Sequence, residues 1–208
     1  MNNDDVLIVL TGDKGGVGKS TLAALIAEWY VAVDVKVKLI DADPNQTLQT
    51  WVDKCQQLGY RVSWPEATLT VVDTAGTVGA SLNKYIRHAD VILVPLQPHV
   101  ADLEVVVGWF LSLKESLAER VIFVPNRLTR TREQREGIKE LQSVLHEEGR
   151  GELAAGLSNR PAVYPPLLNG RGVNFFAANG SEKIVAETRP LITAITDRLK
   201  GEPHEIEC

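Results

Sequence analysis

The sequence predicts an α/β fold with a mostly parallel, twisted sheet flanked by helices on both faces. Short unbroken apolar runs of strand length alternate along the chain with stretches of helical periodicity. Apolar runs without polar alternation are typical of parallel strands, because helices cover both faces of such a sheet. The alternation of the two patterns favours parallel connections. The chain has 208 residues, so we expect a single domain over residues 1–208.

Five apolar runs are the expected strands of this sheet. They are Val6 to Leu10, Val37 to Ile40, Leu69 to Val72, Val91 to Val94 and Val121 to Val124. Four apolar stripes with helical spacing are the expected helices, and they cover Leu22 to Val33, Leu103 to Leu117, Ile138 to Leu145 and Ile184 to Leu199. Pro190 lies inside the last stripe, so we expect it to kink or split that helix.

Composition limits the class and location of the protein. With 44% hydrophobic and 24% charged residues, the chain resembles an ordinary globular protein. Its net charge of −5 argues against coating of nucleic acid through charge alone, although residues 120–200 are basic. Met1 to Asp5 is polar and acidic, unlike a signal peptide, and we find no apolar run of membrane-spanning length. We expect a cytoplasmic protein, with residues 201–208 as a disordered acidic tail.

A glycine-rich loop separates the first expected strand from the first expected helix. It reads Thr11-Gly12-Asp13-Lys14-Gly15-Gly16-Val17-Gly18-Lys19-Ser20-Thr21. Glycines let a backbone wrap a polyphosphate with its N–H groups inward, and the helix N-terminus adds a positive dipole. The predicted nucleotide-binding residues are Gly15, Gly16, Val17, Gly18, Lys19, Ser20 and Thr21. Lys19 is expected to reach the β- and γ-phosphates, and the Ser20 hydroxyl is expected to bind Mg²⁺. The alternative is that the glycine-rich segment is merely a flexible turn.

Carboxylates follow the second and third expected strands. Asp41 and Asp43 lie two residues apart, a spacing that suits a network of Mg²⁺ and water at the edge of the sheet. Asp73 follows the third run. Two alternatives stay open: Asp43 only caps the next helix, or Asp73 is a strand-terminal aspartate without a ligand.

The segment Lys14-Gly15-Gly16-Val17-Gly18-Lys19-Ser20 resembles the deviant Walker A motif of the ParA/MinD family, and the resemblance extends from Val6 to about Leu199. The general Walker A motif has glycine where this chain has Asp13. The resemblance implies a P-loop ATPase that hydrolyses ATP to ADP and phosphate, with ATP and Mg²⁺ as cofactors. It also implies an ATP-sandwich homodimer in which Lys14 contacts the phosphates bound by the partner.

Roles for the carboxylates follow from the same resemblance. Asp43 corresponds to the residue that positions or activates the attacking water, and Asp41 to one that supports the magnesium shell. Asp73 corresponds to the Walker B carboxylate that holds the metal. The chain departs from the common pattern at Asn45, where glutamine is usual, and at Ala75-Gly76, where many relatives have two prolines, so the role of Gly76 stays open.

Asn126 and Arg127 follow the fifth expected strand and are predicted to contact the adenine base. An asparagine amide can pair with both the donor and the acceptor edge of a base, and relatives often place a base-contacting residue here. An ordinary turn asparagine is the alternative for Asn126.

Short partition ATPases without an N-terminal helix-turn-helix are the members that the chain resembles most. This resemblance implies nonspecific DNA binding and association with the nucleoid. It also implies release by a ParB-like or other cargo adaptor protein that stimulates hydrolysis. The predicted DNA-contacting residues are Arg127, Arg130, Arg132, Arg160 and Arg171. Glutamates interleave with several of these arginines, which also fits a solvated helix face.

Three functions therefore stay open. The first is a ParA-like ATPase that segregates or positions a plasmid, chromosome locus or other cargo. The second is an ATP-dependent dimeric adaptor of a cellulose, flagellar or secretion system that binds protein rather than DNA. The third is a small-molecule P-loop enzyme. Membrane binding is not expected, because the end of the chain is acidic and interrupted by Pro203.

Overall fold

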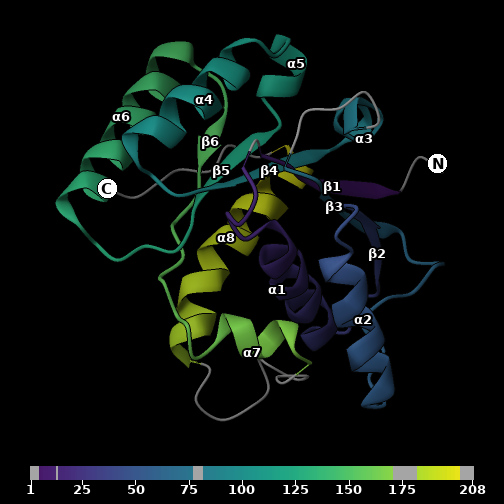
Figure 1. Ribbon diagram of the computed structural model, residues 1–208. Helices are drawn as coiled ribbons and strands as arrows, with labels where there is room; N and C mark the ends of the chain where they lie inside the picture. Colours follow the sequence, from purple (N-terminus) through teal and green to yellow (C-terminus); the bar gives the residue numbers. More distant parts are fainter. Residues whose placement is uncertain (1–4, 13, 77–81, 171–181, 202–208) are drawn as a thin grey trace.

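The computed structural model describes residues 5–12, 14–76, 82–170 and 182–201 (Figure 1). The strands are β1 (Val6–Leu10), β2 (Val37–Ala42), β3 (Leu69–Thr74), β4 (Val91–Leu96), β5 (Val121–Pro125) and β6 (Glu152–Leu153). The helices are α1 (Lys19–Ala32), α2 (Thr47–Gln57), α3 (Leu82–His88), α4 (Val100–Leu111), α5 (Glu115–Ala118), α6 (Arg132–Glu148), α7 (Tyr164–Leu168) and α8 (Glu182–Lys200).

The strands form one parallel sheet in the order β2-β3-β1-β4-β5-β6, which confirms the predicted fold class. β1 lies in the middle, with β3 on one side and β4 on the other, so the strand order reverses there. In open α/β sheets, ligands bind outside the carboxyl ends of the strands at such a reversal. The glycine-rich loop leaves β1 at this edge.

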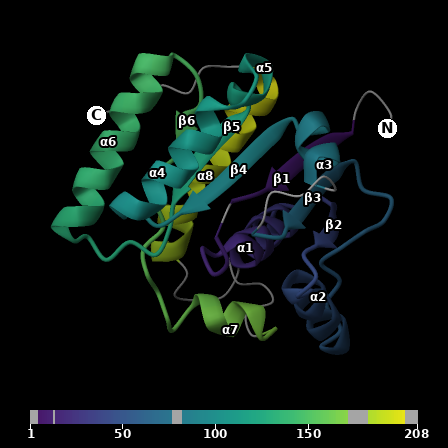
Figure 2. The ribbon, with the colours of Figure 1, turned by 45° about the horizontal axis from the view of Figure 1, so that its top comes forward.

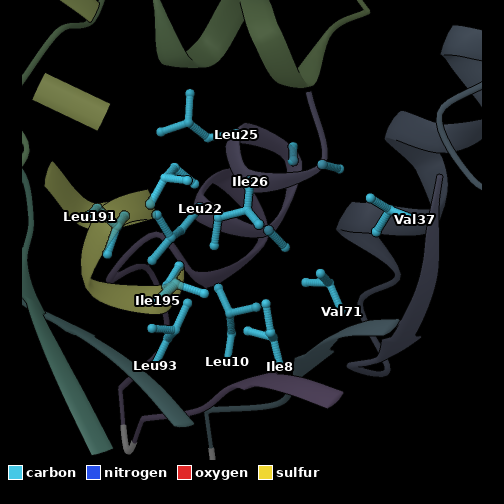
Figure 3. Packing of buried hydrophobic residues seen from close by; sticks show 14 of the residues in the cluster. Ile8, Leu10, Leu22, Leu25, Ile26, Val37, Val71, Leu93, Leu191 and Ile195 are labelled. Carbon is cyan, nitrogen blue, oxygen red and sulfur yellow. The ribbon is translucent and has the colours of Figure 1, made fainter. Parts of the chain in front are cut away.

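Helices cover both faces of the sheet (Figures 1 and 2). One face packs against α1, α2, α7 and α8, and the other against α3, α4, α5 and α6. Alternate residues of β1 face opposite cores, because Ile8 and Leu10 belong to the first cluster and Leu7 and Val9 to the second. Figure 3 shows side chains of α1 and α8 gathered over Ile8 and Leu10. The buried face of α1 thereby fixes the position of the loop that precedes it.

Several details differ from the expectations. The stripe from Leu103 to Leu117 is divided between α4 and α5, because the first helix ends at Leu111. Pro190 does not split the helix, since α8 is one helix with Pro190 inside it, and the alternative of a kink stays a prediction. β2, β3 and β4 each extend two residues beyond their apolar runs, so that Asp41 and Asp73 lie within strands.

Two further expectations concern the ends and surface of the chain. Residues 202–208, and with them most of the expected tail, lie outside the described residues. No described helix is long and apolar enough to cross a membrane.

Candidate functional site

The glycine-rich loop between β1 and α1 turns through backbone conformations that only glycine adopts without strain. Gly16 has φ 78° and Gly18 has φ 101°. Gly18 is the N-cap of α1, and no described side chain caps this helix. The first N–H groups of α1 lie at this turn, where the sequence predicts that a phosphate binds.

Lys19 lies inside this loop. The residue is buried, with 6% of its surface exposed. Its Nζ donates a hydrogen bond of 3.0 Å to the carbonyl of Lys14. The ammonium group of Lys14 pairs with the Asp102 carboxylate on α4. The structure thus brings together the two lysines that the sequence predicts for phosphate binding, one buried in the loop and one half-exposed at its rim.

Asp73 is the best candidate for a metal ligand. It is fully buried, and neither carboxylate oxygen accepts a hydrogen bond from the part of the chain that the structure describes. Burial is the main cause that raises the pKa of Asp73 to about 7, and Asp41 and Asp43 raise it further, while the nearby Ser20 hydroxyl and Lys19 ammonium oppose the rise. A fully buried carboxylate is costly unless a cation or proton neutralises it. Asp73, with Ser20 beside it, therefore fits a bound Mg²⁺.

Asp41 and Asp43 lie at the same edge but make backbone contacts. Register places Asp41 directly opposite Asp73 in the neighbouring strand. Both Asp41 oxygens accept backbone hydrogen bonds, from Asp43 N at 3.0 Å and from Gln49 N at 2.9 Å. Asp43 Oδ1 accepts from Asn45 N at 2.9 Å. Asp41 thus stabilises the turn into α2, and its role in the magnesium shell and that of Asp43 towards water stay predictions.

Gly76 packs against the backbone of the phosphate loop. A Cβ added to Gly76 would lie 2.9 Å from both Gly15 N and Lys14 C, closer than such atoms approach. Two residues earlier, the Thr74 hydroxyl donates a hydrogen bond of 2.7 Å to the carbonyl of Leu10 at the end of β1. The segment after β3 is therefore held against the loop after β1, and glycine at position 76 allows the contact.

A cavity of about 250 Å³ opens beside the phosphate loop. Gly18 and Thr21 line the cavity on the side of the loop, and apolar side chains such as Leu25 and Leu157 form its walls. Arg127 and Arg160 contribute polar groups to the lining. Apolar walls with a few polar groups are typical of pockets for small ligands. Its position at the start of α1 suits the base and sugar of a nucleotide whose phosphates lie in the loop.

Comparison with known proteins agrees with this geometry. Residues 8–166 match the family described as the CobQ/CobB/MinD/ParA nucleotide binding domain. The chain belongs to this family. A stretch of 112 residues is 25% identical to protein ParA of Rhizobium radiobacter, covering 46% of this chain and 50% of that protein. The chain thus spans about half the length of the curated relative that it matches.

Solved structures share the family fold at low sequence identity. One is a putative plasmid partition protein of Borrelia burgdorferi bound to AMPPNP, with a TM-score of 0.68, 17% identity, and coverage of 93% of this chain and 99% of that one. Another is the MinC:MinD cell division protein complex of Aquifex aeolicus, with a TM-score of 0.65, 18% identity and 98% coverage of both chains. Such identities establish a common fold and leave site roles to the residues themselves.

The arginines predicted to contact DNA have different environments within the family fold. Arg127 and Arg130 are exposed, and both have positive φ values, 54° and 60°. Arg132 is exposed and pairs with Glu136 one helical turn later. Arg160 donates two hydrogen bonds to Glu187 on α8, of 2.6 and 3.0 Å. Arg171 lies outside the described residues.

Arg160 is therefore engaged inside the molecule. Burial raises the pKa of Glu187, but the hydrogen bonds from Arg160 and Ser158 outweigh burial and lower that pKa below its usual value. A phosphate contact by Arg160 would compete with this pair. Arg127 and Arg130 are exposed, and DNA contact by any of these arginines stays a prediction.

Sequence reasoning missed some residues of this family site. Asp102 is separated from Lys14 by 88 positions, and Glu187 from Arg160 by 27. Neither acid lies in a motif, and such pairs depend on how distant elements pack. Thr74 was also missed, although it follows Asp73 directly. Its hydroxyl, at the end of an expected strand, is the local feature that could have indicated the hydrogen bond to Leu10.

Proposed function

We propose that this chain is an ATPase of the partition or positioning type. It binds Mg²⁺ and ATP, forms a homodimer with ATP at the interface, binds DNA without sequence specificity, and is released when a cargo adaptor stimulates hydrolysis. The proposal extends the family assignment to the mechanism that the family resemblance implies for Lys14, Asp43 and Asp73.

The observation that carries the proposal is the arrangement around Asp73. The fully buried carboxylate of Asp73 lies near the buried ammonium of Lys19 and the Ser20 hydroxyl at the start of α1. Phosphate-binding N–H groups, a lysine and a cation-binding carboxylate are the parts that phosphoryl transfer needs. Few other ligands than a magnesium nucleotide would use all three.

Ser20 and Asp73 would hold the Mg²⁺, which when bound neutralises negative charge on the phosphate oxygens. Lys19 leaves the Lys14 carbonyl to contact phosphate, because a phosphate oxygen is a stronger acceptor for an ammonium than a neutral carbonyl. Asp43 is partly exposed beside this position, where it can orient a water molecule. Lys14 lies at the rim, from which its half-exposed ammonium can reach a second subunit.

ATP hydrolysis with and without nonspecific duplex DNA, at low and moderate salt, tests the proposal. We expect DNA to stimulate hydrolysis at low salt and the effect to fall steeply as salt rises, because only phosphate contacts are involved. Lys14→Ala should lose the stimulation together with ATP-dependent dimerisation. ATP-dependent dimers that form equally well in Lys14→Ala would show the mechanism to be wrong.

The pairing of the basic residues favours a second candidate. Arg160 is paired with Glu187 and Arg132 with Glu136, which leaves few free cations on the described part of this surface. An ATP-dependent adaptor that binds protein uses the same dimer without a basic face. Hydrolysis that requires Lys14 but does not respond to DNA at any salt concentration would favour this adaptor.

A further inference from the structure

The side chain of Asn126, at the end of β5, is directed to the phosphate loop. Only 7% of the residue is exposed. Its Nδ2 donates a hydrogen bond of 2.8 Å to the carbonyl of Val17, and its Oδ1 accepts one of 2.9 Å from the backbone N–H of Arg127. The backbone N–H of Asn126 donates to the carbonyl of Leu96 in β4. The amide is thus fixed at both ends and joins the loop after β1 to the end of β5.

Glycine at position 18 makes this contact possible. A Cβ added to Gly18 would lie 2.4 Å from Asn126 Nδ2, so any other residue would displace the amide. Gly18 also has φ 101°, a conformation that side chains disfavour. The same glycine therefore allows both the turn of the loop and the approach of the asparagine.

The hydrogen bond to Arg127 supports a backbone that is otherwise unfavourable. Arg127 has φ 54°, in the left-handed region that residues with a Cβ rarely adopt. Arg127 and Asn126 both line the cavity beside the loop. A single buried side chain thus bonds both to the phosphate loop and to the neighbouring residue at the cavity.

We propose that Asn126 is a positioning residue that holds the Val17–Gly18 turn in the shape that binds phosphate. This inference rests on the proposed function, because it assigns a role within the same nucleotide site. It differs from the predicted contact with the adenine base, since the amide acts on the protein backbone. Loss of the amide should weaken binding of any triphosphate, whether or not a base is attached.

Binding of two ligands separates the two roles of Asn126. The probes are ATP and inorganic tripolyphosphate, each with Mg²⁺, measured by calorimetry on the full chain. Asn126→Ala should weaken both ligands by the same factor, about five- to tenfold, which corresponds to one buried hydrogen bond between neutral groups. Asn169→Ala is the matched control, because this exposed amide bonds to Lys54 and lies outside the site, so it should change neither affinity.

A second variant keeps the test decisive if the alanine variant does not fold. Asn126→Asp retains an acceptor for Arg127 N but places a carboxylate oxygen against the Val17 carbonyl, so tripolyphosphate binding should fall at least as far. Circular dichroism of each variant establishes that it is folded. Weakened ATP binding with unchanged tripolyphosphate binding in both variants would overturn the inference and favour the base contact. Failure of the unchanged protein to bind either ligand would instead overturn the proposed function, and the inference with it.

Discussion

Lys14 and Asp102 form an ion pair within one chain, between the rim of the phosphate loop and helix α4. The carboxylate is the more buried partner, with 18% of its side chain exposed against 48% for Lys14. The same loop residue gives its carbonyl to Lys19 and contacts Gly76 through its backbone. In the proposed dimer, Lys14 must leave Asp102 to reach the partner's phosphates, so the two contacts compete.

Asp102→Asn should therefore promote dimerisation. Removal of the carboxylate frees Lys14 at a cost typical of a partly exposed ion pair, so the ATP concentration that gives half-maximal dimer should fall about two- to fivefold. Sedimentation velocity over a series of ATP concentrations measures this shift. Glu104→Gln is the control, because it removes an exposed carboxylate from the same helix without touching the loop. A higher ATP requirement in Asp102→Asn would show that the pair assists dimerisation and does not compete with it.

Gly76→Ala should disrupt the nucleotide site. The added methyl group would contact the backbone of Lys14 and Gly15, which cannot move away without changing the phosphate loop. We expect ATP affinity to fall by about tenfold or more, as when a buried contact of more than 1.4 kcal/mol is lost. Equilibrium binding of a fluorescent ATP analogue measures the loss.

Gly108→Ala provides the matched comparison for that substitution. Gly108 lies in α4, where an added Cβ meets no atom within 4 Å, and alanine favours a helix by about 0.5–1 kcal/mol over glycine. This variant should bind the nucleotide with unchanged affinity and have a slightly higher melting temperature. Equal ATP affinity in the two variants would show that the close approach of Gly76 to the loop does not matter for binding.

Local sequence determined much of the fold, and long-range packing determined what was missed. Ile8 and Leu10 face one core and Leu7 and Val9 the other, so an unbroken apolar run was sufficient to predict β1 as a strand buried on both faces. The break between α4 and α5 carried no such signal, because residues 112–114 contain neither glycine nor proline.

The candidate site shows the same division. Glycine spacing predicted the phosphate loop, and the end of a strand predicted Asp73. The register that places Asp41 opposite Asp73 is a property of the assembled sheet. The hydrogen bonds of Asn126 to Val17 and of Arg160 to Glu187 likewise join residues that only the folded chain brings together. Residue types in the sequence were sufficient to name candidate site residues. Which role each residue can take depends on its hydrogen-bond and ion-pair partners in the folded chain.

Arg160→Ala and Arg130→Ala should separate stability from DNA binding. Arg160 bonds to Glu187 through two nitrogens, so its loss leaves a partly buried carboxylate without its partner and should destabilise the fold by about 1–2 kcal/mol. Arg130 is exposed, and its truncation should leave stability unchanged within about 0.5 kcal/mol. Urea unfolding measures both effects.

DNA affinity of the same two variants gives the converse comparison. If Arg130 neutralises a DNA phosphate, its removal should reduce the slope of log affinity against log salt by about one. Arg160→Ala should keep the original slope wherever the protein is folded. A reduced slope in Arg160→Ala alone would assign the phosphate contact to Arg160 and require that it leave Glu187 on binding.

The pKa of Asp73 predicts how stability depends on pH without nucleotide or metal. Its folded-state pKa of about 7 lies above the ordinary value of 3.8, so the folded chain holds a proton that the unfolded chain releases. Stability therefore falls as pH rises from about 4 to 7 and changes no further on this account above that range.

Asp73→Asn removes this titration, so between pH 5 and pH 8 the variant should gain about 2–3 kcal/mol relative to the unchanged protein. Urea unfolding at both pH values, in EDTA, measures the difference; a constant difference between the two proteins would show that Asp73 is ionised in the folded state at pH 5. At pH 8 the Asp73 carboxylate is mostly ionised, so Mg²⁺ with ATP should stabilise the unchanged protein more than Asp73→Asn, which offers the cation no charged oxygen.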